Sequence, residues 1–143
     1  MGVLMLRYQP IDHTADLGLR VWGATLPELF ANAAEGMCAL YFELAAVQPR
    51  EERAVSADGY DREEVLVDWL RQLLYGIEVD RFLPCRFDIL RLEDTHLDAA
   101  VRGEGYDPGR HRWRTGIKAV TYHDLHVVRD AGGEWSVQII FDT

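Results

Sequence analysis

Asp12-His13-Thr14-Ala15-Asp16 stands between an apolar lead-in over residues 8–11 and a run over residues 17–23 in which Leu, Leu and Val alternate with other residues. Period-two alternation predicts a strand with one buried face. Asp and Thr at a strand corner are ordinary turn chemistry, but this stretch carries two carboxylates, an imidazole and a hydroxyl. Two interpretations follow: a plain turn, or half of an oxygen-rich cation site. The other half would be Asp142 and the terminal carboxylate of Thr143, if the fold joins the two ends.

Two amphipathic helices are predicted in the first half of the chain. Thr25-Leu26-Pro27-Glu28 is a capping box, in which the Thr hydroxyl accepts a first-turn N–H and the Glu side chain reaches back. Apolar residues then recur at spacings of three and four as far as Tyr41, which predicts a helix of about seventeen residues. Asp61 caps a second helix, whose apolar face is wide enough to cover a sheet. That face consists of Val65, Leu66, Trp69, Leu70, Leu73, Leu74 and Ile77.

After Pro84 the hydrophobic period changes from that of a helix to that of strands. The predicted strands cover residues 86–92, 97–102, 117–129 and 135–141, with a hairpin turn at 130–133. Residues 42–59 give a weak signal, with a short strand near 53–57. Segregated helices and hairpin-linked strands predict one α+β domain over residues 1–143, with two helices packed on one face of a largely antiparallel β-sheet.

The composition excludes several classes of protein. Of the 143 residues, 48% are hydrophobic, which excludes a disordered chain and allows a sizeable core. The 24 acidic and 15 basic residues give a net charge of −9, which argues against direct, high-affinity binding to nucleic acid. Cys38 and Cys85 form no C-x-x-C pair and are expected to be reduced core residues. No run approaches the ~20 apolar residues of a membrane span, and a cytoplasmic protein is expected.

Three other clusters have less support as functional sites. His123-x-x-His126 has a spacing used for zinc, but residues three apart on a strand face opposite ways, so a zinc site is not expected. The basic segment Arg110–Arg114 is interpreted as a solvated loop rather than a contact for phosphate or an acidic partner. Ser56 and Ser136 lack a neighbouring His and Asp arrangement, so nucleophilic hydrolysis is not predicted.

Lys118 begins a polar stretch, Lys-Ala-Val-Thr-Tyr-His-Asp, within the predicted strand 117–129. A Lys in such a strand ordinarily extends to the rim of the core. In a functional interpretation its ammonium lies beside the carboxylates of Asp16 and Asp142, or on a phosphate of a partner. Clustered carboxylates repel one another unless a cation sits among them, and oxygen donors without thiolates select Ca²⁺, Mg²⁺ or Mn²⁺ rather than zinc.

Taken together, these motifs resemble those of the archease family. The matching features are Asp12-His-Thr-Ala-Asp16 followed by Leu-Gly-Leu, Leu29-Phe30 with Ala33-Ala34, Lys118-Ala-Val-Thr-Tyr-His123, and Asp142 next to the chain end. The resemblance runs from about residue 8 to residue 143 and implies a non-catalytic accessory protein. Archeases assist the GTP-dependent RNA ligase of tRNA splicing and RNA repair, promoting guanylylation of the ligase and multiple turnover.

The resemblance also implies site residues and a cofactor. The metal ligands of the family correspond to Asp16, Asp142 and Thr143, with Ca²⁺ the favoured ion and Mg²⁺ or Mn²⁺ as alternatives. Lys118 corresponds to a functionally important position, and Asp12, His13 and His123 are expected to face the partner. The expected partner is the RNA ligase itself, which the acidic surface would meet by electrostatic steering.

Two alternatives remain open. One is a stand-alone divalent-metal-dependent phosphohydrolase, with Asp16 and Asp142 as ligands and His13 or His123 as general base. The other is a chaperone-like binding module that shields apolar surface on RNA-processing proteins. Turnover of a phosphoester, or suppression of aggregation that is independent of Asp16, would distinguish these alternatives.

Overall fold

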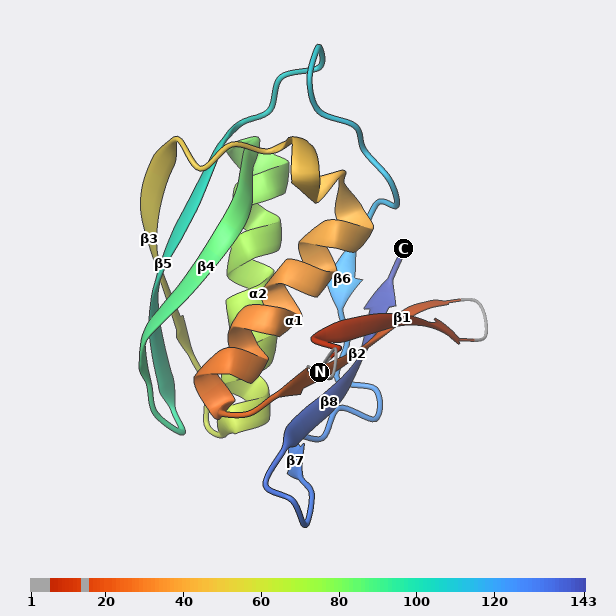
Figure 1. Cartoon of the computed structure of the whole chain (residues 1–143), viewed down its shortest axis with the longest axis vertical. Helices are drawn as coiled ribbons and strands as arrows, with labels where there is room; N and C mark the ends of the chain where they lie inside the picture. Colours follow the sequence, from red (N-terminus) through yellow and green to blue (C-terminus); the bar gives the residue numbers. More distant parts are fainter. Residues whose placement is uncertain (1–5, 14–15) are drawn as a thin grey trace, which may run out of the picture.

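The computed structural model describes residues 6–13 and 16–143. Two α-helices, a short 3₁₀ helix and eight strands follow one another along the chain (Figure 1). The helices are α1 (Leu26–Tyr41), η1 (Leu44–Ala46) and α2 (Arg62–Val79). The strands are β1 (Tyr8–His13), β2 (Asp16–Gly23), β3 (Glu51–Asp58), β4 (Phe82–Leu92), β5 (His96–Gly105), β6 (Ala119–Val120), β7 (Val128–Arg129) and β8 (Trp135–Asp142).

The predicted α+β class and antiparallel pairing are confirmed, but the strands divide between two sheets. One sheet has the order β1-β2-β8-β6, with β7 also on β8, and the other has the order β3-β5-β4. The helices contact both sheets and lie between them (Figure 1), so the prediction of helices on one face of a single sheet needs this correction. The reason is visible in α1, which buries residues 32–34 and 36–38 as well as Leu29 and Phe30, more than one face of the helix.

Local chemistry fixes the starts of both helices. The N–H of Glu28 donates to the Thr25 hydroxyl at 3.2 Å, as the capping box predicts, while the Glu28 carboxylate accepts from the N–H of Ala24 at 3.0 Å. Asp61 caps α2 by accepting from the N–H of Glu64 at 2.9 Å. The seven predicted core residues of α2 are all buried, and the Trp69 indole donates to the carbonyl of Phe30 at 3.0 Å. This bond ties the two helices together in the core.

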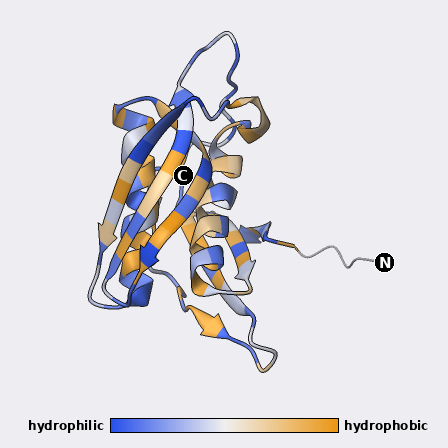
Figure 2. Ribbon diagram, turned by 60° about the vertical axis from the view of Figure 1, so that its left-hand side comes forward, coloured by the Kyte–Doolittle hydropathy of each residue, from blue (hydrophilic) through white to orange (hydrophobic). Residues whose placement is uncertain are grey.

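The sheet β3-β5-β4 extends beyond its predicted strands. β3 covers the whole of residues 51–58, although its alternation is weak, and β4 begins at Phe82 rather than after Pro84. Pro84 is accommodated because β4 is an edge strand, where a missing N–H costs little. The register shifts between Pro84 and Arg86, where β5 approaches closely: a Cβ at Gly103 would lie 1.9 Å from the Leu83 carbonyl oxygen. Along this sheet hydrophilic and hydrophobic residues alternate (Figure 2).

The prediction of one long strand over residues 117–129 is wrong. Only Ala119–Val120 and Val128–Arg129 pair with β8, at opposite ends of it. Both the N–H and the hydroxyl of Thr121 donate to the Ile140 carbonyl, after which the chain leaves the sheet in a turn. Asp124 within that turn has a φ of 49°, a left-handed conformation that a strand does not contain. Its short polar side chain makes this conformation accessible.

Candidate functional site

Pairing in the first sheet brings the segment around Asp16 next to the C-terminal strand. β1 pairs with β2 so that His13 lies opposite Asp16, and β2 pairs with β8 so that Leu17 lies opposite Phe141. Asp16 and Asp142 therefore occupy adjoining positions, each one residue beyond that last pair. β6 continues the row, because Ala119 lies opposite Asp142. We call this set of residues the strand-end row: Asp12, His13, Asp16, Lys118, Asp142 and Thr143.

The strand-end row places both aspartates on the outer side of the sheet. Leu17 and Phe141 lie two residues from the core residues Leu19 and Ile139 on their strands, so they share the face that points toward the helices. Residues directly opposite one another in an antiparallel pair share a face, so Asp16 and Asp142 project from the side opposite to Leu17. Both are exposed. Asp12 pairs with Leu17 and belongs by alternation to the other side of the row.

Lys118 lies next to Asp142 through the main chain. Its N–H donates to the Asp142 carbonyl at 2.7 Å, which holds the start of β6 against the end of β8. Lys118 and Thr143 are both exposed. The expected position of the Lys118 ammonium beside the two carboxylates stays a prediction. Thr14 and Ala15, which complete the motif between β1 and β2, lie outside the described residues.

His123 does not lie on a strand as the sequence predicted. It stands in the turn after β6, where its Nε2 lies 3.3 Å from Asp124 Oδ2. Its N–H donates to the Thr121 hydroxyl at 3.3 Å, and its side chain is exposed. The pairing register that defines the strand-end row does not include it. Neither His123 nor His126 is in a strand. Strand geometry therefore does not place their side chains on opposite faces, as the sequence analysis assumed.

The donors in the strand-end row have the chemistry of a hard-cation site. Among the side chains that the structure describes, those of residues 6–12 and 16–143, no three His, Cys, Asp or Glu gather closely enough to hold a metal ion. The row instead offers the carboxylates of Asp16 and Asp142 together with the terminal carboxylate of Thr143. Oxygen donors of this kind fit Ca²⁺, Mg²⁺ or Mn²⁺, whereas zinc prefers nitrogen and sulfur.

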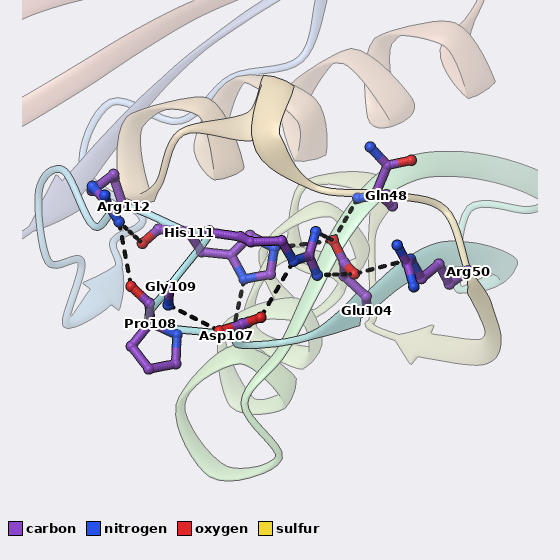
Figure 3. Close-up of polar contacts among 9 residues, drawn as sticks. Gln48, Arg50, Glu104, Asp107, Pro108, Gly109, His111 and Arg112 are labelled. Carbon is purple, nitrogen blue, oxygen red and sulfur yellow. Dashed lines mark hydrogen bonds and ion pairs between the residues drawn. The ribbon is translucent and has the colours of Figure 1, made fainter.

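A second polar cluster joins Glu104 of β5 to the loop that follows, and it corrects one part of the prediction of a solvated basic loop: Arg110, Arg112, Trp113 and Arg114 are exposed, but His111 is buried (Figure 3). Glu104 is 5% exposed, and Arg110 donates to both of its carboxylate oxygens. The N–H of Gln48 donates to Glu104 Oε2 at 2.7 Å, and Arg50 Nε lies 3.4 Å from Oε1. Hydrogen bonds from Arg110, from the N–H of Gln48 and from His111, led by those of Arg110, lower the pKa of Glu104 to about 2 even though burial opposes the charge.

His111 completes this cluster and is buried rather than solvated. The N–H of Asp107 donates to its Nδ1 at 2.8 Å, so Nδ1 is an acceptor and the ring proton is assigned to Nε2. Nε2 then donates to Glu104 Oε2 at 3.0 Å. The segment Arg110–Arg114 is thus fastened to β5 at one end instead of forming a free basic loop. The signal available in the sequence was the acidic pair Glu104 and Asp107 only a few residues earlier, which local charge neutralisation would have used.

Aromatic rings hold the other half of the same loop. Trp113 forms an isolated bridge with Phe42 and stacks near Tyr106, with ring centroids 4.8 Å apart. The ring centroid of Trp113 lies 5.4 Å from that of Tyr41. The Cζ of Arg81 lies over the same indole ring, 6.0 Å from its centroid. Trp113 remains 37% exposed. The loop from β5 to β6 is therefore anchored by a charged contact on β5 and an aromatic contact at the end of α1.

The architecture and the strand-end row define a class of protein: a two-sheet α+β domain in which two exposed aspartates, Asp16 and Asp142, adjoin at the ends of neighbouring strands. The model of the Archease protein family (MTH1598/TM1083) matches residues 8–143. The protein archease of Methanopyrus kandleri is 38% identical over 138 residues, covering 94% of this chain and 98% of that protein. The protein archease of Methanosarcina mazei is 36% identical over 140 residues, covering 95% of each. The chain belongs to the archease family.

Solved structures agree with this assignment. The solution structure of protein 1598 from Methanobacterium thermoautotrophicum superposes with a TM-score of 0.78 at 31% identity, covering 96% of this chain and 99% of that one. A crystal structure from Thermotoga maritima, described as an archease and possible chaperone, gives a TM-score of 0.66 at 24% identity, covering 99% and 100% of the chains, and shows the shared fold. In the described part of the chain, no helix has the length and apolar character needed to cross a membrane.

Proposed function

We propose that this archease is a cytoplasmic accessory protein that activates a GTP-dependent RNA ligase in tRNA splicing and RNA repair. In this proposal it promotes guanylylation of the ligase and multiple turnover, and performs no catalysis of its own. The observation that supports the proposal most is the strand-end row. Residues that are more than a hundred positions apart in the sequence, Asp16 and Asp142, adjoin one another on the exposed end of a sheet.

We further propose that the strand-end row holds a divalent cation, with Ca²⁺ favoured. Asp16, Asp142 and the carboxylate of Thr143 would be its ligands. When bound, the ion supplies positive charge that offsets the repulsion between neighbouring carboxylates and orients them. The chain itself fixes both aspartates through the β2–β8 ladder and holds Lys118 against Asp142 by a main-chain bond. Asp16 and Asp142 thereby project from the outer side of the sheet, where a partner can reach them.

Electrostatics supports a protein partner rather than direct contact with RNA. The net charge of −9 repels a phosphate backbone, whereas a protein that binds RNA carries a basic surface. Attraction between an acidic and a basic surface raises the rate of encounter more than it raises the affinity. The proposed ligase contact is therefore expected to weaken with salt mainly through slower association.

The test is single-turnover guanylylation of a purified RNA ligase of this type, with GTP and divalent metal, in the presence of substoichiometric amounts of this chain. We expect acceleration that is lost in Asp16→Ala and Asp142→Ala. Asp88→Ala is the matched control, because it removes an exposed aspartate from β4 in the other sheet, and it should accelerate normally.

Three outcomes would contradict the proposal. Full stimulation by Asp16→Ala would remove the strand-end row from the mechanism. Turnover of a phosphoester by the chain alone, abolished by a chelator, would favour the phosphohydrolase. Suppression of aggregation of unrelated proteins, unchanged in Asp16→Ala and without any effect on guanylylation, would favour the chaperone-like module.

A further inference from the structure

A groove runs along the outer edge of β3, far from the strand-end row in sequence and on the other sheet. Among the described strands β3 pairs only with β5, so one side of its backbone is an open edge (Figure 1). A pocket of about 220 Å³ lies between this edge and α2. Four consecutive β3 residues, 53–56, line it. Since side chains alternate along a strand, consecutive residues can line one pocket only by presenting their backbone to it.

Hydrogen bonds at the end of β3 show which backbone groups face the groove. The N–H of Gly59 donates to Thr95 on the β5 side, whereas the N–H of Asp58 points the other way and donates to Asp68 of α2 at 2.9 Å. By alternation, the N–H and C=O groups of Ala54 and Ser56 also point away from β5. The Asp68 carboxylate thus satisfies the last outward N–H of β3, and the preceding positions form the edge available to another strand.

The opposite wall of the groove contains a glycine that the fold does not require. Gly76 lines the pocket from the interior of α2, and a Cβ at this position would meet nothing within 4 Å. Glycine within a helix is destabilising relative to alanine, so its presence here departs from local preference without any benefit to packing. On the same helix Tyr75 is 61% exposed and Val79 is 58% exposed. A bare backbone beside exposed apolar side chains is suited to close approach by another chain.

The charges around the groove indicate what that chain carries. At one end, Glu51 and Asp80 share the single guanidinium of Arg53, each at 3.5 Å. At the other end, Asp58 and Asp98 share His96, at 2.7 and 2.9 Å. In each of these two groups two carboxylates share one cation, and of their members Arg53 and Asp80 line the pocket itself. The floor of the pocket is apolar, with Phe82 and Val101 among its lining.

A second copy of this chain would meet repulsion in the register that pairs Ala54 with Ser56. Antiparallel pairing of two β3 edges about Val55 would place Glu52 of one copy opposite Asp58 of the other, and by symmetry this would occur twice. Like charges directly opposite one another destabilise a strand pair. Edge strands use such charges to prevent pairing with themselves.

We propose that the β3 edge and α2 form a docking groove for an extended segment of a partner protein, in which apolar residues alternate with Lys or Arg. The segment adds a strand to β3 through the groups of Ala54 and Ser56 and inserts an apolar side chain over Gly76. Main-chain bonds supply affinity in this mode, and the pocket and the terminal carboxylates supply selectivity. The docking groove does not depend on the proposed role with an RNA ligase.

The test titrates the full ¹⁵N-labelled chain with a pool of end-blocked octapeptides in which Val, Leu or Phe alternates with Lys or Arg. We expect the amides of Ala54 and Ser56 to exchange with solvent at least tenfold more slowly in the complex. Ala54→Pro removes an outward N–H without removing a bond to β5 and should weaken binding at least tenfold. Ala54→Val keeps that N–H and should bind normally.

A second pair of variants tests the pocket independently of the edge. Gly76→Leu should fill the space above the helix and weaken binding about tenfold or more, whereas Gly76→Ala should retain binding. Far-UV circular dichroism of each variant verifies folding. Absence of protection at Ala54 and Ser56 with every peptide, or equal binding by Ala54→Pro and Ala54→Val, would overturn the proposal. Concentration-dependent self-association that Ala54→Pro abolishes would assign the edge to a second copy instead.

Discussion

The second polar cluster, which we call the Glu104 cluster, and the strand-end row place their carboxylates in opposite environments. Glu104 is almost completely buried, and the protein surrounds it with Arg110, Arg50, His111 and the N–H of Gln48. Asp16 and Asp142 adjoin one another at an exposed sheet end instead. The first arrangement is buried and fastens a loop, whereas the two aspartates of the second are exposed to solvent, where a cation or a partner can reach them. The lowered pKa of Glu104 therefore reflects a structural ion-pair network rather than a catalytic group.

The largest expected effect is on stability at Glu104. Glu104→Gln removes the charge that Arg110 and His111 contact and should lower the free energy of unfolding at pH 7 by about 2–3 kcal/mol, because hydrogen bonds to charged groups are the strong ones. Urea denaturation of the two proteins measures the difference. An unchanged midpoint would show that the loop does not depend on this cluster.

The same substitution has a predictable dependence on pH. The pKa of Glu104 falls from its ordinary value of 4.5 to about 2 in the folded protein, mainly through Arg110. A carboxyl whose folded pKa is depressed contributes stability above its unfolded pKa, and this contribution is lost as the pH falls from about 4.5 to about 2. The difference between wild type and Glu104→Gln should therefore shrink across this window. A difference that stays constant from about pH 7 to about pH 2.5 would contradict the assignment.

A smaller effect is expected at His96, where exposed carboxylates share a cation that titrates. Hydrogen bonds to Asp58 and Asp98 raise the pKa of His96 above its ordinary value of 6.5. Because the folded pKa is raised, the stabilisation is complete below pH 6.5 and is lost as the pH rises through the folded value. NMR titration of the ring should give a midpoint above 6.5 that returns toward it in Asp58→Asn. A midpoint that the substitution leaves unchanged would show that Asp58 does not hold the imidazolium.

The smallest effect on stability is expected at the strand-end row. Asp142→Asn alters an exposed residue at a strand end, and without divalent metal it should change the free energy of unfolding by no more than about 0.5 kcal/mol. If this variant were less stable than Glu104→Gln, the contrast between the two clusters would be reversed. Urea denaturation in the presence of a chelator provides the comparison.

Sequence patterns predicted the parts of the fold that depend on local periodicity and caps. The helix faces, the Thr25 and Asp61 caps and the final strand 135–141 agree closely with the structure. Patterns could not predict that the helices lie between two sheets, since this depends on long-range pairing. Nor did they show that residues 121–127 leave the sheet, because their alternation imitates a strand while Asp124 adopts a left-handed turn.

The candidate site was predicted unevenly for a similar reason. Asp16, Asp142 and Lys118 were selected by motif resemblance, and their proximity required the β2–β8 register to be known. The burial of His111 was missed because the whole-chain charge suggested a solvated basic segment. Its actual environment is set by one acidic residue on the neighbouring strand, Glu104.

Titration of the chelator-treated protein with Ca²⁺, followed by calorimetry and ¹⁵N NMR, is the most direct test of whether the strand-end row binds a divalent cation. We expect one saturable site, with shift changes concentrated at residues 16–18 and 140–143. Binding should weaken at least tenfold in Asp142→Asn and remain unchanged in Glu104→Gln if that variant is folded. Absence of saturable binding of Ca²⁺, Mg²⁺ or Mn²⁺, or binding that Asp142→Asn leaves intact, would contradict the assignment of the strand-end row as a cation site.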